Sequence, residues 1–193
     1  MASDMNHDSV PQTLTEWVYE STGVTSARCY QCGKCSAGCP LAADMDYPPS
    51  VILRLLQTGT EKNADKVLRS FTIWLCLTCE MCYARCPMEV DIPKLMDYLR
   101  CESLRQKKVN PRAKDIIRFH RSFLDSIEQT GRLYEVGLIA DYKTRSRHLF
   151  QDVGMAPKML TKGKLPLFPE LIKDRPQMSR IFRKTLKKAE DKV

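Results

Sequence analysis

The sequence lacks several features that would assign it to common protein classes. Its longest hydrophobic run, from Phe71 to Leu77, is far shorter than the roughly 18 residues of a membrane-spanning helix. Residues 1–10 are polar and contain no apolar core of a secretory signal. The G-x-G-x-x-G fingerprint of dinucleotide-binding folds is also absent. We therefore expect a cytoplasmic protein with no membrane span and no dinucleotide site of its own.

Charge and aromatic content exclude a further class of partner. Lysine and arginine exceed aspartate and glutamate by 31 to 23, which gives a formal net charge of +8. No aromatic residues alternate with the late basic residues in the way that base stacking requires, so we expect no nucleic-acid partner. We interpret the basic stretch near the C-terminus as a solvated helix face or a docking surface for an acidic partner: Arg180, Arg183, Lys184, Lys187 and Lys188.

Cysteine, in contrast, is abundant. Eight of the nine cysteines form two copies of the pattern C-x2-C-x2-C-x3-C-P, which are Cys29, Cys32, Cys35, Cys39 with Pro40, and Cys76, Cys79, Cys82, Cys86 with Pro87. This spacing resembles that of bacterial-type ferredoxins, which hold [4Fe–4S] clusters. Three thiolates spaced by two residues can wrap three corners of one cubane. The fourth lies beyond its reach, before a proline that fixes φ, and ligates the other cluster.

The pattern therefore predicts two [4Fe–4S] clusters that share their ligands across the two motifs. One is assigned to Cys29, Cys32, Cys35 and Cys86, and the other to Cys76, Cys79, Cys82 and Cys39. The exchange should bring the clusters close enough for direct electron transfer. Each all-cysteine cluster carries a charge of about −2 when oxidised, which lowers the net charge of the loaded protein to about +4.

Two other uses of cysteine fit the pattern less well. Disulfides are disfavoured because nine is an odd number and no secretory signal is present. Structural zinc usually pairs two C-x2-C arms across a longer spacer than the one seen here. The ninth residue, Cys101, lies on the helix expected after Asp91, and we predict a free thiol at a secondary packing face of that helix.

Caps and apolar periodicity predict helices along the chain. Thr13-x-x-Glu16 is a capping box that opens a helix ending at Gly23. Pro48-Pro49 open a second helix, which ends at Gly59, with an apolar face of Val51, Ile52, Leu55 and Leu56. Phe71–Leu75 is interpreted as the lead-in to the second cysteine loop, despite its strand-like composition. Further helices are predicted over 61–69, 91–104, 110–129 and 133–142, and from Gln177 onward.

The 35 residues between the motifs, 41–75, are thus occupied by helices instead of hairpins. We predict an all-α, helical ferredoxin-like domain over residues 11–145, stapled by the two clusters. A disordered tail over residues 1–10 precedes it. A basic, partner-docking extension over residues 146–193 follows, which prolines divide into extended pieces: Pro157, Pro166, Pro169 and Pro176.

Two runs beyond the cysteine motifs narrow the comparison with known families. Val90-Asp91-Ile92-Pro93 follows the second motif, and Phe119-His120-Arg121-Ser122-Phe123 precedes Gly131-Arg132-x-x-Glu135. With these runs, the chain from about Leu14 to Ile139 resembles the C subunit of heterodisulfide reductase, which is the iron–sulfur subunit of the soluble methanogen complex.

The resemblance implies a non-catalytic electron-relay subunit of an oxidoreductase. Such subunits pass electrons from a flavin-containing A subunit to the B subunit, where the heterodisulfide of coenzyme M and coenzyme B is reduced in methanogenesis. The A and B subunits of heterodisulfide reductase are the implied partners, within a larger complex with a hydrogenase or formate dehydrogenase. The chain agrees in lacking an adjacent Cys–Cys pair like those in the CCG motifs of the B subunit. The alternative is a similar relay in a membrane-associated anaerobic dehydrogenase, and a zinc-stapled scaffold is a remote one.

Titratable residues outside the cysteines, both near the motifs and later in the chain, have simpler interpretations than catalysis. We expect His120 to be a packed helix residue, and Arg132 and Glu135 to form an i,i+3 pair or a partner contact. Positive charge should raise the reduction potential of one cluster and negative charge should lower that of the other; these charges are Arg28, Lys34 and Arg85 against Glu80.

Overall fold

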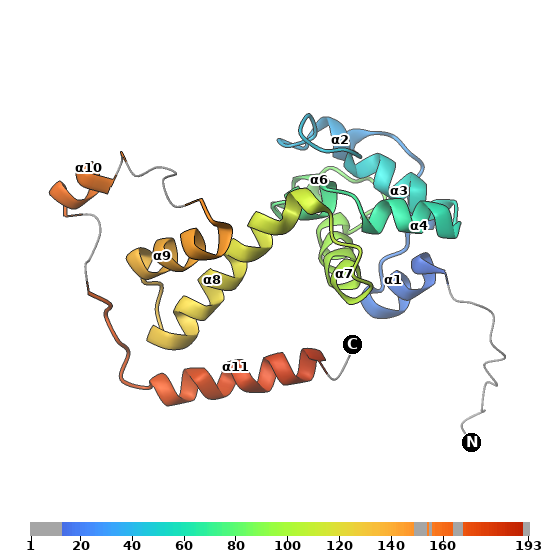
Figure 1. Ribbon diagram of the computed structural model, residues 1–193. Helices are drawn as coiled ribbons and strands as arrows, with labels where there is room; N and C mark the ends of the chain where they lie inside the picture. Colours follow the sequence, from blue (N-terminus) through green and yellow to red (C-terminus); the bar gives the residue numbers. More distant parts are fainter. Residues whose placement is uncertain (1–12, 149–153, 155, 164–167, 191–193) are drawn as a thin grey trace, which may run out of the picture. The chain divides into compact units, whose positions relative to one another are not determined.

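The computed structural model describes residues 13–148, 154, 156–163 and 168–190, and these residues form helices and no strand (Figure 1). The all-α prediction is confirmed for this part of the chain. The tail expected over residues 1–10 lies outside it. No helix within the described ranges has both the length and the apolar character needed to cross a membrane.

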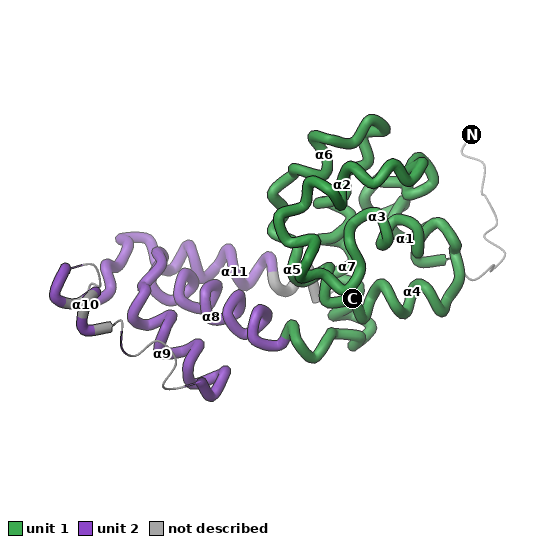
Figure 2. The backbone as a smooth tube through the Cα atoms, turned by 90° about the horizontal axis from the view of Figure 1, so that it is seen from above, with its two compact units in different colours: residues 1–113 green, residues 114–193 purple. Residues whose placement is uncertain are grey.

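Two compact units divide the chain, residues 1–113 and residues 114–193 (Figure 2). The domain bounds predicted from the sequence, 11–145 and 146–193, stay a prediction. The sequence marks Asn110-Pro111 as a helix start, but it gives no local sign that a packed unit ends there. The docking role assigned to residues 146–193 stays a prediction.

Unit 1 carries both cysteine motifs within a group of short helices. In chain order these are α1 (Leu14–Thr22), η1 (Ser26–Arg28), α2 (Lys34–Ala37), α3 (Pro49–Gln57), α4 (Glu61–Leu68), α5 (Thr72–Leu75), α6 (Met81–Ala84), α7 (Ile92–Arg105) and η2 (Pro111–Ala113). Each cysteine motif leads into a one-turn helix, α2 or α6, and these two turns pack against each other. The packing of short helices therefore brings the two motifs together.

Local capping signals set several helix ends as the sequence predicts. Thr13 accepts a hydrogen bond from the Glu16 N–H, and the Glu16 carboxylate accepts one from the Thr13 N–H. Gly23 ends α1 in the left-handed conformation, with φ of 72°. Asp91 caps α7 by accepting a hydrogen bond of 3.0 Å from the Lys94 N–H. A side-chain cap of this kind stabilises a helix by about 1 kcal/mol.

Helix α7 is the centre of unit 1, and α1, α4, α5 and α6 pack against it. Its predicted apolar stripe is buried, since none of its side chains is more than 1% exposed: Ile92, Leu95, Met96 and Leu99. Burial of one such side chain contributes about 2 kcal/mol. The stripe of α3 differs in part from the prediction. Ile52 and Leu56 are buried as expected, but Leu53 is buried while Val51 is 38% exposed.

The segment Phe71–Leu75 leads into the second cysteine loop as predicted and is not a strand, but Thr72–Leu75 forms a single helical turn, α5, that the sequence does not indicate. Two N–H groups at its start donate to the carboxylate of Asp46, at 2.7 and 2.9 Å. Arg100 of α7 donates to two carbonyl oxygens at its end, those of Ile73 and Cys76. These partners are 24 to 27 residues away in sequence, so a local pattern could not reveal the turn.

Unit 2 consists of α8 (Lys114–Thr130), α9 (Glu135–Ser146), α10 (Ala156–Thr161) and α11 (Arg175–Glu190), and α8 packs against α9 and α11. The α9 bounds lie later than the predicted 133–142. Helix α10 occupies part of the segment predicted to be extended, because Pro157 lies in its first turn, where proline is tolerated. Among the described side chains of this unit, those buried are few: Ser122, Leu138 and Ser146.

Candidate metal centre

The two cysteine loops follow the same backbone path. The second and fourth residues after the first cysteine are left-handed in both loops, Gln31 (φ 64°) and Gly33 (φ 77°) in one and Thr78 (φ 52°) and Glu80 (φ 62°) in the other. This conformation costs a non-glycine residue about 1 kcal/mol or more, and such strain collects at functional sites. Each loop then enters its helical turn, so the third cysteine of each motif lies in α2 or α6. The motifs are thus a structural repeat as well as a sequence repeat.

A small cavity contains four cysteines drawn from both motifs. Cys76, Cys79 and Cys82 of the second motif line it together with Cys39 of the first, and the other motif cysteines do not. Its wall is mostly apolar and includes Leu41, Met45, Ile92 and Met96. We call Cys76, Cys79, Cys82 and Cys39 site 2.

Three of the other four motif cysteines lie near Tyr30. Desolvation, a hydrogen bond with Cys32 and the charges of Cys32, Cys86 and Cys29 all raise the pKa of the Tyr30 hydroxyl. Cys35 in turn lies near enough to Cys29 for its charge to raise the Cys35 pKa. Cys86 therefore lies with the first motif, although it belongs to the second in sequence. We call Cys29, Cys32, Cys35 and Cys86 site 1.

Contact between α2 and α6 accounts for this exchange of the fourth cysteines. The Arg85 side chain lies across Gly38, where an added Cβ would be 2.5 Å from Arg85 Nη1. Glycine therefore leaves the space that lets the two turns approach. Cys39 and Cys86 directly follow these two residues, so each emerges next to the opposite motif.

Exposure varies along both motifs in the same order. The second cysteines, Cys32 and Cys79, are exposed, whereas the third cysteines are buried (Cys35) or half-buried (Cys82). Burial raises the pKa of the Cys82 thiol to about 12, and the charges of Cys76 and Cys35 contribute to that rise. Sites 1 and 2 therefore adjoin at their third cysteines and reach the surface at their second cysteines.

The donor set fits iron–sulfur clusters better than single metal ions. All eight candidate ligands are sulfurs, the soft donor that these clusters use. In the described part of the chain, no three His, Cys, Asp or Glu side chains lie close enough to hold one metal ion. A cubane spreads its four thiolates over separate corners. All nine cysteines are free thiols in the structure, and a coordinating metal displaces the proton of a thiol outright.

Gln57 supports site 1, and sequence reasoning missed it. Its amide donates to the carbonyl oxygens of Ser26 (2.9 Å) and Cys29 (2.6 Å), and its oxygen accepts from Gln31 Nε2 (3.2 Å). Gln31 also donates to Cys29 Sγ from its backbone N–H (3.4 Å) and from Nε2 (3.5 Å). Gln57 lies 28 residues from Cys29 and reaches it through the packing of α3 on η1, for which one sequence carries no signal.

The structure places several residues outside the motifs for which the sequence predicts a role. Cys101 is exposed on α7 instead of packed, and His120 is exposed on α8. Arg132 forms its ion pair with Glu170, at 2.5 Å, and not with Glu135. The side chains of Lys187 and Lys188 lie outside the described residues, and the rest of the basic stretch is exposed: Arg180, Arg183 and Lys184.

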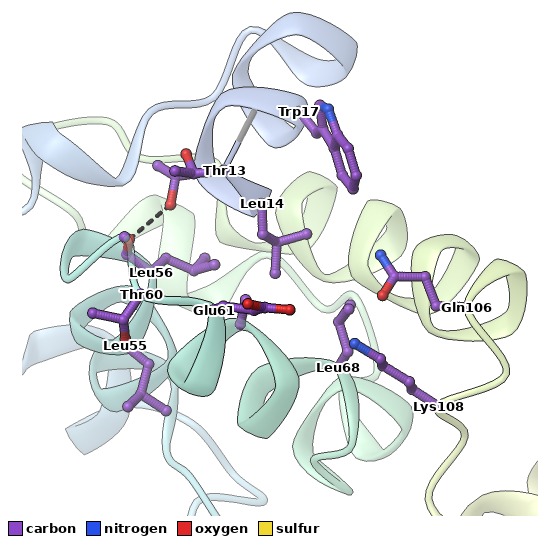
Figure 3. A pocket seen from close by; sticks show the side chains of 13 residues that line it. Thr13, Leu14, Trp17, Leu55, Leu56, Thr60, Glu61, Leu68, Gln106 and Lys108 are labelled. Atoms are coloured by element: carbon purple, nitrogen blue, oxygen red, sulfur yellow. Dashed lines mark hydrogen bonds between the residues drawn. The ribbon is translucent and has the colours of Figure 1, made fainter. Parts of the chain in front are cut away.

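A separate cavity of about 410 Å³ lies among α1, the α3–α4 turn and the C-terminal end of α7 (Figure 3). No motif cysteine lines it, so it is not part of the metal centre. Both apolar and polar side chains line it, among them Leu14, Leu56, Leu68, Glu61, Gln106 and Lys108.

The sequence is similar to those of known iron–sulfur proteins. Residues 25–90, which contain both motifs, match the family described as a 4Fe-4S dicluster domain. The chain is 40% identical over 92 residues to the iron-sulfur C subunit of the CoB--CoM heterodisulfide reductase of Methanopyrus kandleri, over 46% of each chain. It is 38% identical over 72 residues to the C2 subunit of the H(2)/formate:CoB-CoM heterodisulfide,ferredoxin reductase of Methanococcus maripaludis, over 37% of each chain.

A third relative matches over a longer region at lower identity. The C subunit of the ferredoxin:CoB-CoM heterodisulfide reductase of Methanosarcina mazei is 26% identical over 149 residues, which is 77% of this chain and 82% of the relative. The chain spans less than half the length of the first two relatives in its match to them. The resemblance to the C subunit of heterodisulfide reductase is confirmed.

Proposed function

We propose that this chain is the electron-transfer subunit of a heterodisulfide reductase and holds two [4Fe–4S] clusters, one at site 1 and one at site 2. In this role it relays electrons from a flavin-containing A subunit to the B subunit, which reduces the heterodisulfide of coenzyme M and coenzyme B. The observation that carries the proposal is the exchange of fourth cysteines. Cys39 lines the cavity of the second motif, and Cys86 lies beside Tyr30 of the first. The match to a dicluster domain supports the count of two.

The arrangement of the side chains suits a relay better than a catalyst. When bound, each cluster supplies a centre that takes up and gives out one electron at a time. Four thiolates at each site leave no iron position open for a substrate. Cys35 and Cys82 keep the two centres adjacent, and Cys32 and Cys79 reach the surface, where partner subunits can approach.

The test uses the full-length chain loaded with iron and sulfide without oxygen. The chemically reduced chain, mixed with the B subunit, is expected to recover its oxidised visible absorbance when the heterodisulfide is added. Without the B subunit we expect no recovery, because neither site offers an open iron. Consumption of the heterodisulfide by the chain alone, with only a chemical reductant, would contradict the relay role.

A variant separates relay from catalysis. Cys79→Ala removes a ligand of site 2 and should slow turnover driven by the A subunit at least tenfold. Reduction of the heterodisulfide by the B subunit with an artificial dye should stay unchanged, since the dye bypasses this chain. Loss of the dye-driven reaction in the same complex would show that site 2 takes part in the chemistry itself.

A further inference from the structure

The two motifs are alike in backbone but differ in the side chains at equivalent positions. Tyr30 of the first motif corresponds to Leu77 of the second, and Lys34 corresponds to Met81. The two left-handed positions also differ, because Gln31 and Gly33 are replaced by Thr78 and Glu80. The first loop is thus richer in hydrogen-bond donors and positive charge, while the second is more apolar and carries a carboxylate.

Hydrogen bonds to the cysteine sulfurs follow this difference. At site 1, Cys29 Sγ accepts from the Gln31 N–H and from Gln31 Nε2, and Cys86 Sγ accepts from the Val90 N–H at 3.4 Å. The Tyr30 hydroxyl also lies close to Cys32. At site 2, in contrast, no side chain among the described residues donates a hydrogen bond to a cysteine sulfur.

Formal charge adds to the same asymmetry. Lys34, between two ligands of site 1, is exposed and has no ion pair among the described residues, and neither has Glu80, between two ligands of site 2. Arg100 lies near Cys76, but Asp97 pairs with it at 2.7 Å and offsets its charge. Arg85 lies across Gly38, where the two motifs meet, so its charge acts on both sites.

Reduction adds one negative charge to a cluster. Donors aimed at its sulfurs and nearby cations stabilise that charge, so they raise the reduction potential, while a carboxylate lowers it. We propose that site 1 has the higher potential, so that electrons enter the chain at site 2 through the exposed Cys79 end and leave from site 1 through the exposed Cys32 end. The inference rests on the proposed relay function and adds its direction. It assigns the electron-donating partner to the Cys79 end and the electron-accepting partner to the Cys32 end.

The surfaces at the two ends differ in the same sense. At the Cys79 end the exposed neighbours are largely apolar: Leu77 (67%), Met81 (42%) and Tyr83 (42%). At the Cys32 end, Tyr30 is 59% exposed. Arg28 and Lys34 lie within six residues of Tyr30 in sequence, Arg54 of α3 lines the same pocket as Tyr30, and all three basic side chains are exposed. The donor therefore meets an apolar surface and the acceptor a basic one.

The test is a redox titration of the anaerobically loaded full-length chain, followed by electron paramagnetic resonance. We expect two signals with distinct midpoint potentials. Cys29→Ser should change the line shape of one signal and so identify site 1. Lys34→Met and Gln31→Leu introduce an uncharged or donor-free side chain and should lower the potential of that signal only. Met81→Lys should raise the potential of the other signal, and Lys66→Met, at an exposed position of α4, should shift neither.

The outcomes separate this inference from the proposed function. A chain that binds no [4Fe–4S] cluster would overturn both. Two clusters with equal potentials, or a lower potential at the signal identified as site 1, would overturn the direction and leave the relay intact. Lys34 is exposed, so Lys34→Met should fold even if Gln31→Leu does not. Stopped-flow reduction by the electron-donating partner supplies a second readout, since Leu77→Glu should slow that step at least tenfold and leave oxidation by the acceptor unchanged.

Discussion

At the scale of single residues, two charged side chains outside the motifs hold the backbone that leads into site 2. Asp46 accepts both N–H groups at the start of α5 and also the Thr72 hydroxyl, at 2.6 Å. Although desolvation of the carboxylate would raise its pKa, the hydrogen bonds from Thr72 and neighbouring N–H groups hold the pKa of Asp46 below its usual value. Arg100 satisfies the carbonyl groups at the other end of α5. The turn before Cys76 is therefore fixed by charge-assisted hydrogen bonds.

Replacement of Asp46 tests the first of these contacts. Asp46→Ala leaves N–H groups of α5 without an acceptor, which should lower the free energy of unfolding by about 2 kcal/mol. Because the folded-state pKa is lowered, the charged carboxylate contributes stability above the unfolded pKa of about 3.9. That contribution is lost only as pH falls through the lower folded-state value. Anaerobic urea titration of the loaded wild type and variant measures the difference.

The lowered pKa of Asp46 also predicts how the stability difference depends on pH. The difference between wild type and Asp46→Ala should stay constant from about pH 7 to about pH 5, since Asp46 is ionised throughout that range. Asp44→Ala, in the same loop and exposed, serves as the control and should change stability by less than about 0.5 kcal/mol. A difference that shrinks already between those two pH values would contradict a lowered pKa.

Arg100 should affect site 2 alone. Arg100→Met keeps the aliphatic stem but removes the donors to the Ile73 and Cys76 carbonyl groups, so Cys76 loses its fixed position. We expect the loaded chain to hold about four irons in place of about eight, and the resonance signal of site 2 to disappear. Lys94→Met, on the exposed side of the same helix, should keep the full iron content. Equal loss of both signals would show that Arg100 supports the whole unit.

At the scale of helices, sequence reasoning succeeded where the signal is local. The capping box of α1, its stop at Gly23 and the Asp91 cap of α7 each depend on residues within one helical turn, and all three are confirmed. The turn α5 was missed because a short apolar segment fits either strand or helix, and contacts distant in sequence decide between them. Helix α10 was missed because Pro157 is a helix breaker only beyond the first turn.

The same distinction between local and long-range signals applies to the residues of the candidate site. The cysteine spacing predicts which residues gather, because the motif itself encodes the loop. The supporting side chains could not be predicted, since Gln57 and Arg100 reach the site only after α3 and α7 have packed. Cys101 was expected to pack because a free cysteine is usually buried, but its position on α7 faces solvent.

Exchange of the fourth cysteines across α2 and α6 gives a prediction at this scale. Cys86→Ser should disturb the electron paramagnetic resonance signal of the cluster at site 1, which Cys29, Cys32 and Cys35 also hold. The signal of the cluster at site 2 should stay largely unchanged, although Cys86 belongs to the second motif in sequence. Cys39→Ser should do the reverse. Cys101→Ser, outside both motifs and exposed, is the control and should change neither signal. If Cys86→Ser disturbed only the signal of Cys76, Cys79 and Cys82, each motif would hold its own cluster.

At the scale of the whole molecule, each of the two units is stabilised by different interactions. Unit 1 has a buried apolar core around α7, and its two sites would each tie residues of one motif to the other across about 50 residues of chain. In unit 2, the described residues show few buried side chains. An ion pair of Arg145 with Asp125 (2.7 Å) links α9 to α8, and a second one with Asp141 (2.8 Å) lies within α9. Metal binding should therefore govern the stability of unit 1 in particular.

Removal of the metal tests this dependence. The anaerobically purified chain should contain about eight irons and eight sulfides, and stoichiometric zinc without iron would contradict both sites. Because metal binding supplies folding free energy, and thiols as buried as Cys82 bind only by losing a proton, chelation should abolish the cooperative unfolding of unit 1 and reduce its helical circular dichroism. Hydrogen exchange distinguishes the units, since α7 should lose protection while α8 keeps its own. Unchanged protection of α7 in the metal-free chain would mean that its apolar core suffices to hold the two motifs together.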